Sequence, residues 1–177
     1  MAYGANTHAR NTDKLRSDVD GLRIRTAVLV DSKPQGTGAG NAVTNAWTTR
    51  TINNLLHNDD NIVAGIASNV FTLRGGHTYR ISALFPFTDT QETMLRIWNT
   101  TYNVEAERGQ SFHFDNNTSG IATVVGVVTI SRDTSYKIEY YCKKDGTNSL
   151  GKPANISGYT EEYGVVEINR LTGLKPD

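Results

Sequence analysis

From Arg25 onward, the sequence consists of β-branched and aromatic runs separated by clusters of Gly, Asn, Asp and Ser, with almost no helical periodicity. The spacing of these clusters predicts short strands joined by turns, and residues 74–77 and 131–135 have the composition of hairpin connections. About eight to ten short strands indicate an all-β, antiparallel jelly-roll sandwich and not a parallel sheet. The strands are expected at 25–31, 47–53, 70–74, 77–87, 93–101, 103–107, 121–130, 136–144 and 163–171, with 61–66 as a further candidate.

The size and charge of the chain narrow the function of such a sandwich. A length of 177 residues suits one domain with a short appendage. Eighteen basic and 18 acidic residues cancel, which disfavours electrostatic capture of nucleic acid or of an anionic membrane. No apolar run approaches the roughly 20 residues of a membrane helix, so no membrane insertion is expected. The single Cys142 excludes an internal disulfide framework, and the N-terminus lacks the features of a secretory signal, so we expect synthesis in a reducing cytoplasm.

The strand expected at 121–130 is apolar on both faces. One set of alternating residues is Ile121, Val125 and Val127, and the other is Ala122, Val124, Val128 and Ile130. Because a sandwich strand has only one face against its own core, the second face requires a subunit interface or a covering loop. We predict a homotrimer with Val125, Val127, Tyr136 and Tyr140 in its interface. A one-residue change of register would exchange the faces of 121–130, so the face that meets the trimer axis is left open.

Residues 1–23 differ from the rest of the chain in composition and in the spacing of their apolar residues. Residues 1–12 are small and polar and read as an arm, and Thr12 then begins a short amphipathic helix with Leu15, Val19 and Leu22 along one stripe. An isolated helix of this length is marginal in water, so its stripe is buried on another chain or on the base of its own domain. We predict an anchoring segment, with a capping helix as the alternative.

Residues that could carry catalysis or bind metal do not form a recognisable pattern. The histidines His8, His57, His77 and His113 are not paired at metal-ligand spacing. The Asp- and Asn-rich stretches beside His57 and His113 could hold calcium, although these residues are also the usual turn formers. No nucleophile elbow or phosphate-binding loop is found, and no two carboxylates stand out as a glycosidase pair. We therefore expect no catalytic residues, no metal site and no cofactor.

The order of several motifs along the chain resembles a known family. The motifs are Ala46-Trp47-Thr48-Thr49-Arg50-Thr51-Ile52-Asn53, Phe71-Thr72-Leu73, Gly76-His77-Thr78-Tyr79-Arg80-Ile81, Leu95-Arg96-Ile97-Trp98-Asn99, Tyr136-Lys137-Ile138-Glu139-Tyr140-Tyr141-Cys142 and Val165-Val166-Glu167-Ile168-Asn169-Arg170-Leu171. Together they resemble the trimeric knob domains of bacteriophage fibre proteins, which are similar to the tumour-necrosis-factor and complement-type jelly rolls. The resemblance covers residues 24 to 171, and the long shaft of a tail fibre is missing.

The resemblance implies a domain plan and a function. Residues 1–23 would anchor the protein to a virion through Leu15, Val19 and Leu22, residues 24–172 would form the knob, and residues 173–177 would be a tail. The expected function is a non-enzymatic component of the phage virion surface, made in the host cytoplasm, fixed to the capsid or tail and projecting outward. The alternative is a tail-fibre tip that binds a host receptor or surface glycan, and a glycan hydrolase is disfavoured because no catalytic constellation emerges.

The outward end follows from the topology of an antiparallel sandwich. Alternate connections share one end, which groups the loops 88–92, 108–119 and 145–162. Two of these loops are long, and long loops on a rigid scaffold are where binding usually resides. Solvated polar connections without a ligand are the alternative. The residues predicted to face a ligand are Phe112, His113, Asn116, Asn148 and Tyr159.

Overall fold

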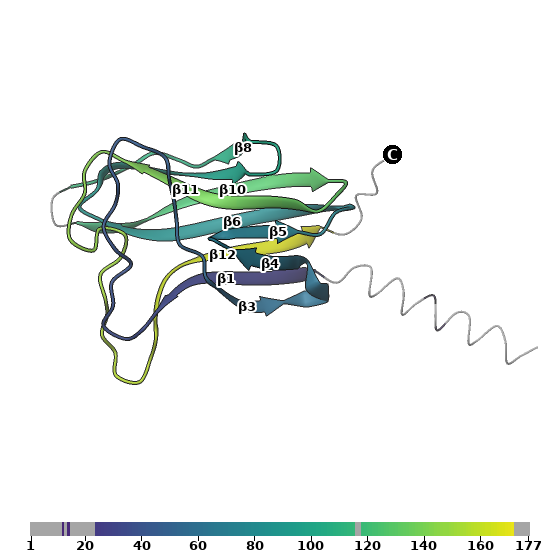
Figure 1. The fold of residues 1–177 in the computed structure, drawn as a ribbon, viewed down its shortest axis with the longest axis horizontal. Helices are drawn as coiled ribbons and strands as arrows, with labels where there is room; N and C mark the ends of the chain where they lie inside the picture. The colour runs from purple at the N-terminus through teal and green to yellow at the C-terminus, as the bar shows by residue number, and fades with distance from the viewer. Residues whose placement is uncertain (1–11, 13, 15–23, 116–117, 172–177) are drawn as a thin grey trace, which may run out of the picture.

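The computed structural model describes residues 12, 14, 24–115 and 118–171, and its strands form two antiparallel β-sheets packed face to face (Figure 1). The anchoring residues Leu15, Val19 and Leu22 lie outside the described residues. The strands are β1 (Arg25–Lys33), β2 (Thr48–Thr49), β3 (Asn54–Asn58), β4 (Val63–Ala67), β5 (Val70–Leu73), β6 (His77–Thr88), β7 (Gln91–Asn99), β8 (Val104–Arg108), β9 (Phe112–Phe114), β10 (Ser119–Ile130), β11 (Thr134–Cys142) and β12 (Glu161–Leu171). The 3₁₀ turn η1 (Asp59–Asn61) lies between β3 and β4.

The strand order agrees with the predicted all-β sandwich. One sheet has five strands in the order β10-β6-β12-β1-β3. The other has the order β4-β5-β11-β7-β8, with β2 added beside β11 and β9 beside β7. Successive strands such as β6 and β7, or β10 and β11, therefore lie in opposite sheets. This arrangement is consistent with a jelly roll.

Strand β6 shows how the sequence pattern builds the core. Tyr79, Ile81, Ala83 and Phe85 alternate along the strand and are all fully buried, as the sequence predicted. The intervening residues, among them Arg80 and Leu84, point away from the core. Each sheet supplies one such apolar face, and the two faces together form one core.

Two strands lie where the sequence analysis expected something else. The segment 47–53 was expected to be a strand, but only Thr48 and Thr49 pair, with β11. The chain then crosses to the other sheet, where the unpredicted strand β3 pairs with the edge of β1. The loop expected at 108–119 contains strand β9, whose three residues pair with β7. Both missed strands are short, and β3 has polar residues at three of its five positions, which weakens the strand pattern in the sequence.

A buried arginine lies inside the sandwich near the end of the long connections. The guanidinium carbon of Arg50 is 4.5 Å from the ring centre of Phe85 and 5.3 Å from that of Phe87. Its Nη2 donates to the carbonyl oxygens of Leu150 at 3.1 Å and Tyr163 at 3.0 Å. Burial lowers the pKa of Arg50 to about 10. Arg50 thus joins the connection that contains it to the connection before β12.

Removing this guanidinium should destabilise the fold. We expect Arg50→Ala to lower the free energy of unfolding by about 3–5 kcal/mol, because two buried carbonyls lose their donor, the rings lose their cation, and a cavity remains. Urea denaturation at fixed protein concentration measures the change. Arg74→Ala is the control, since its side chain is half exposed and pairs with Asp133 at the surface. Equal stability of the two variants would contradict the role assigned to Arg50.

Candidate functional site

The outer face of the five-stranded sheet, formed by side chains that point away from the core, carries an exposed apolar band. We define the band as Ile121, Val125 and Val127 of β10 together with Leu84 of β6. Leu84 lies opposite Thr123, between Ile121 and Val125, so all four side chains share one face. Their exposed fractions are 56% for Ile121, 48% for Val125, 60% for Val127 and 38% for Leu84. The second apolar face predicted for 121–130 therefore exists, and no described loop covers it.

The pairing of β10 with β6 settles the orientation that the sequence left open. Ala122 and Val124 are buried in the core, whereas Val125 and Val127 lie on the outer face. Further across the sheet the outer face becomes polar, with Arg80 opposite Val127 on one side and Asn169 on the other. The apolar band thus lies on the edge strand β10 and at the neighbouring Leu84 of β6.

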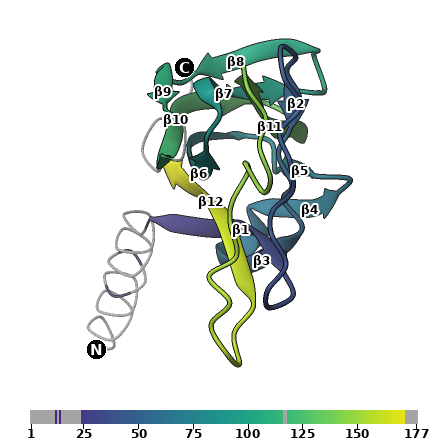
Figure 2. The ribbon, with the colours of Figure 1, turned by 90° about the vertical axis from the view of Figure 1, so that its left-hand side faces the viewer.

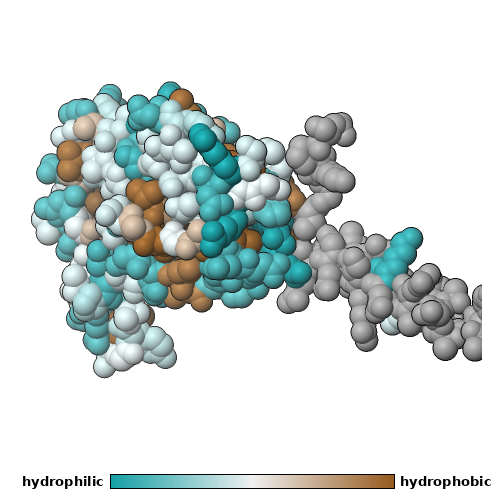
Figure 3. All heavy atoms as spheres, turned by 45° about the vertical axis from the view of Figure 1, so that its right-hand side comes forward, coloured by the Kyte–Doolittle hydropathy of each residue, from teal (hydrophilic) through white to brown (hydrophobic). Residues whose placement is uncertain are grey.

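A second apolar surface adjoins the same edge strand. The side of the sandwich between β8 and β10 holds a hollow of about 330 Å³, and Tyr102 and Val104 at this hollow are each 49% exposed. The two sheets approach closely here because position 126 is glycine: a Cβ there would lie 2.8 Å from the Cβ of Glu107. Strand β10 therefore has exposed apolar groups on its outer face and beside its edge. Figure 3 shows another side of the domain, on which apolar residues lie in patches among hydrophilic ones.

Two of the predicted interface residues lie elsewhere. Tyr136 and Tyr140 are each 1% exposed, so they are buried in their own domain and do not lie on the surface where the predicted interface would need them. Tyr136 stacks on Phe71, Tyr140 packs on Phe87, and burial raises the pKa of Tyr136 to about 12. The physical reason is topological: β11 lies in the seven-stranded sheet and directs these rings into the core.

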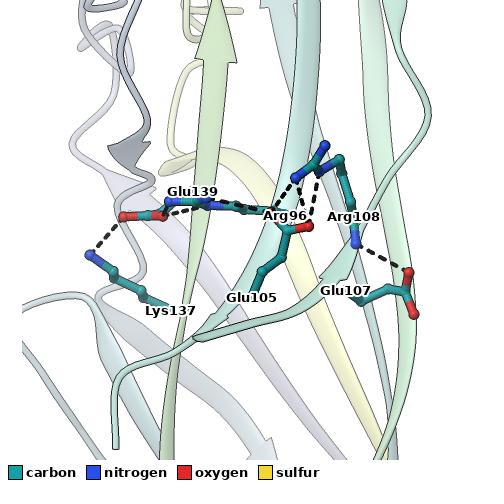
Figure 4. Close-up of polar contacts among 6 residues, drawn as sticks. All are labelled: Arg96, Glu105, Glu107, Arg108, Lys137 and Glu139. Atoms are coloured by element: carbon teal, nitrogen blue, oxygen red, sulfur yellow. Dashed lines mark hydrogen bonds and ion pairs between the residues drawn. The ribbon is translucent and has the colours of Figure 1, made fainter. Parts of the chain in front are cut away.

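The outer face of the seven-stranded sheet has a different character (Figure 4). The guanidinium carbon of Arg96 lies 4.2 Å from the ring centres of both Trp47 and Trp98. Arg96 also binds Glu139, with Nε 2.7 Å from Oε2, and Glu105, with Nη1 3.4 Å from Oε2. Lys137 and Arg108 pair with the remaining carboxylate oxygens, and the hydrogen bond from Arg108 together with the charges of Arg108 and Arg96 lowers the pKa of Glu105. We call this group the Arg96 cluster. Its charges already have partners, which suits a solvated face better than a ligand site.

The loops predicted to share one end are neighbours. The backbone N–H of Thr88 donates to the carbonyl of Ser149 at 2.9 Å, and that of Asp89 to the carbonyl of Thr118 at 2.9 Å. This end lies opposite the start of β1, where Arg25 is the register partner of Arg170 of β12 (Figure 1). Figure 2 looks at the loop end and shows the connections before β2 and before β12 running side by side, joined where Leu150 N–H donates to Gly40.

The residues predicted to face a ligand are placed unequally. Tyr159 is 72% exposed, and His113 is exposed with its Nε2 3.0 Å from Asp115. Asn148 is half-buried. Phe112 was expected in a loop, but it belongs to β9, and its ring centre lies 6.1 Å from that of Phe114. Asn116 lies outside the described residues. The sequence analysis missed a hollow at this end whose lining includes Asp89 and Lys152, because two connections that are distant in the sequence form it.

The Asp-rich stretch beside His57 has structural contacts. Asp60 Oδ2 accepts hydrogen bonds from Arg25 at 2.6 Å and from Arg170 at 3.0 Å. His57 Nε2 lies 3.1 Å from Asp59. Among the described residues, no three His, Cys, Asp or Glu side chains gather as a metal site would require. Within the same residues, no helix has the length and apolar character needed to cross a membrane.

Comparisons with known proteins address the fold. No protein-family model matches this sequence, and no curated protein matches it significantly. The crystal structure of murine APRIL at pH 8.0 is similar, with a TM-score of 0.53 and 8% identity over 84% of this chain and 100% of that chain. The structure of murine APRIL at pH 5.0 has a TM-score of 0.51 at the same identity and coverage. The globular domain of zebrafish complement 1qA has a TM-score of 0.47 and 17% identity over 86% of this chain and 99% of that chain. The likeness to APRIL, a jelly roll, supports the predicted fold.

The Arg96 cluster yields a test that reports directly on its geometry. We expect Arg96→Lys to lower the free energy of unfolding by about 1–2 kcal/mol, because an ammonium cannot lie flat against both rings. The chain has only two tryptophans, Trp47 and Trp98, so their fluorescence should also shift on substitution. Urea denaturation followed by fluorescence measures both effects. Arg108→Lys is the control, and a fluorescence spectrum unchanged in Arg96→Lys would contradict the stacked arrangement.

Proposed function

We propose that this chain is a non-enzymatic structural component of a phage virion: a homotrimeric knob that is fixed to the capsid or tail through its N-terminal segment and projects outward. The observation that carries the proposal is the exposed apolar band of Ile121, Val125, Val127 and Leu84. Soluble monomers rarely leave contiguous apolar side chains in water, so such a band indicates an interface. The assignment to a phage rests on the sequence resemblance to fibre knobs.

A second copy of this chain is the occupant that the surfaces favour. In a twofold dimer, one patch meets itself, whereas in a ring of three the contact joins two different patches on neighbouring copies. Two different apolar surfaces meet at β10: the band on its outer face, and the side of the sandwich that bears Tyr102 and Val104. If the edge of one copy packs on the band of the next, a closed ring covers both surfaces in every copy. The resemblance to trimeric knobs supports three as the number.

The polarity of the domain supports an outward projection. Strand β1 begins at one end of the sandwich, and the grouped loops lie at the other (Figure 1). A particle that holds residues 1–23 would therefore have the loops facing away from it.

The exposed loop end also favours the second candidate, a tail-fibre tip that binds a host receptor or glycan. Tyr159 and His113 are exposed there, on loops that a rigid sandwich supports. Immunogold labelling of particles separates the two candidates, since label on the capsid favours decoration and label on the tail favours host recognition.

The trimer can be tested at the apolar band. We expect light scattering to give a mass of three chains for the unmodified protein, and we expect Val125→Asp to dissociate or unfold it, because a carboxylate buried between copies costs several kcal/mol. Val43→Asp is the matched control, since Val43 is also about half exposed, at 53%, but lies outside the band. Val127→Ser, a milder change, should raise the concentration at which the trimer dissociates. A single-chain mass for the unmodified protein would contradict the proposal.

The anchor can be tested by truncation. We expect deletion of residues 1–22 to leave a folded knob, because the core lies within the two sheets. The truncated knob should no longer join particles in a complementation assay with a phage that lacks the full-length protein. Circular dichroism verifies its folding, and the full chain is the control. Normal incorporation of the truncated protein would disprove this role of the segment.

A further inference from the structure

A hollow of about 560 Å³ opens at the loop end, between the β6–β7 turn and the connection that precedes β12. Its volume falls within the range of about 300–1,000 Å³ that is typical of small-molecule sites. Most such sites are lined mainly by apolar groups, whereas most residues that line this hollow have polar side chains. The lining residues are Thr88, Asp89, Gly146, Thr147, Asn148, Lys152 and Pro153. A ligand that fills it must therefore offer many hydrogen-bonding groups.

The walls of the hollow are held in place by hydrogen bonds from the surrounding structure. Ser149 is fully buried, and its carbonyl accepts the N–H of Thr88 while its Oγ accepts the N–H of Ala42 at 2.7 Å. On the far side, Ala154 N–H donates to Glu161 at 3.0 Å, which fixes the residue next to Pro153. Walls that are formed in advance lower the entropy cost of binding.

The hollow also holds polar groups that the described residues leave available. Asp89 Oδ1 accepts a hydrogen bond from Lys144 Nζ at 2.6 Å. Its Oδ2 has no hydrogen bond from any described residue and faces Gly146, where a Cβ would lie 3.5 Å away. Within the same part of the chain, nothing hydrogen-bonds the side chains of Thr147 and Lys152. Lys144 neutralises the charge of Asp89, and solvent screens the charge of the exposed Lys152. The hollow therefore offers a ligand hydrogen-bonding groups and little net charge.

We propose that this hollow binds a neutral saccharide unit. The free oxygen of Asp89 accepts sugar hydroxyls, Thr147 and Asn148 both donate and accept, and Lys152 donates from the rim. Pro153 offers an apolar surface to the C–H groups of a sugar ring. This inference rests on the proposed outward projection of the knob, which puts the loop end where it can meet a surface glycan.

The test uses the purified full chain on an array of oligosaccharides, followed by calorimetric titration with each oligosaccharide retained. Asp89→Asn removes the carboxylate and suits the backbone, because φ at this position is +54° and asparagine tolerates that region. Gly146→Phe fills the hollow, and Gly146 does not have a positive φ that would strain the variant. We expect the unmodified protein to retain at least one neutral oligosaccharide and each variant to bind it at least about tenfold more weakly.

The matched control is Glu92→Gln. Glu92 is another exposed carboxylate at the same end, and like Asp89 it pairs with a lysine, Lys143. This variant should bind as the unmodified protein does. The proposal would be overturned if the unmodified protein retained no neutral saccharide. It would also be overturned if Asp89→Asn and Gly146→Phe both bound the saccharide as tightly as the unmodified protein does. Light scattering on the same samples keeps this result separate from the trimer: a trimer that binds no sugar refutes the hollow alone, and a monomer that binds sugar refutes the trimer alone.

Discussion

The alternation of side chains along a β-strand is the constraint on which the rest of this structure depends. Each strand offers two faces, and a two-layer sandwich buries only one of them. In β6, the pattern matches this limit, since Phe85 is buried and Arg80 is exposed. In β10, it exceeds the limit, since Val124 is buried and Val125, which is equally apolar, is left half exposed. The chain therefore encodes more apolar surface than its own fold can cover, and much of it lies on the edge strand β10.

The sequence specified the strands well where this alternation was strong. Residues Tyr79 to Phe85 were assigned to the correct face because every second residue is apolar and the others are mostly polar. For 121–130 the alternation could not choose a face, since both are apolar, and only the pairing of Val125 with Ser82 decides it. Tyr136 and Tyr140 were misplaced for a different reason. A local pattern does not say which sheet a strand joins, and β11 joins the sheet opposite β10.

The candidate sites were less predictable than the fold because they depend on contacts between distant segments. Asn148 was singled out from its loop, but Asp89 carries no local signal, and its position beside Gly146 follows only from the two connections meeting. Arg50 is similar. A charged residue between threonines suggests an exposed side chain, yet the rings of Phe85 and Phe87 and the carbonyl of Leu150 enclose it. Its partners lie 35 or more positions away, beyond the reach of any periodicity.

The two outer faces of the sandwich differ in a way that bears on how copies associate. On the seven-stranded sheet, Arg96 is stacked between two tryptophans and paired with Glu139, so water can cover that face at little cost. On the five-stranded sheet, the side chain of Val127 is exposed to water unless another protein surface covers it. Association is therefore favoured on one side of the molecule and at the edge next to it. In the assembly proposed above, contacts through these two surfaces favour a closed ring over a layered stack, because a stack requires adhesion on both opposite faces.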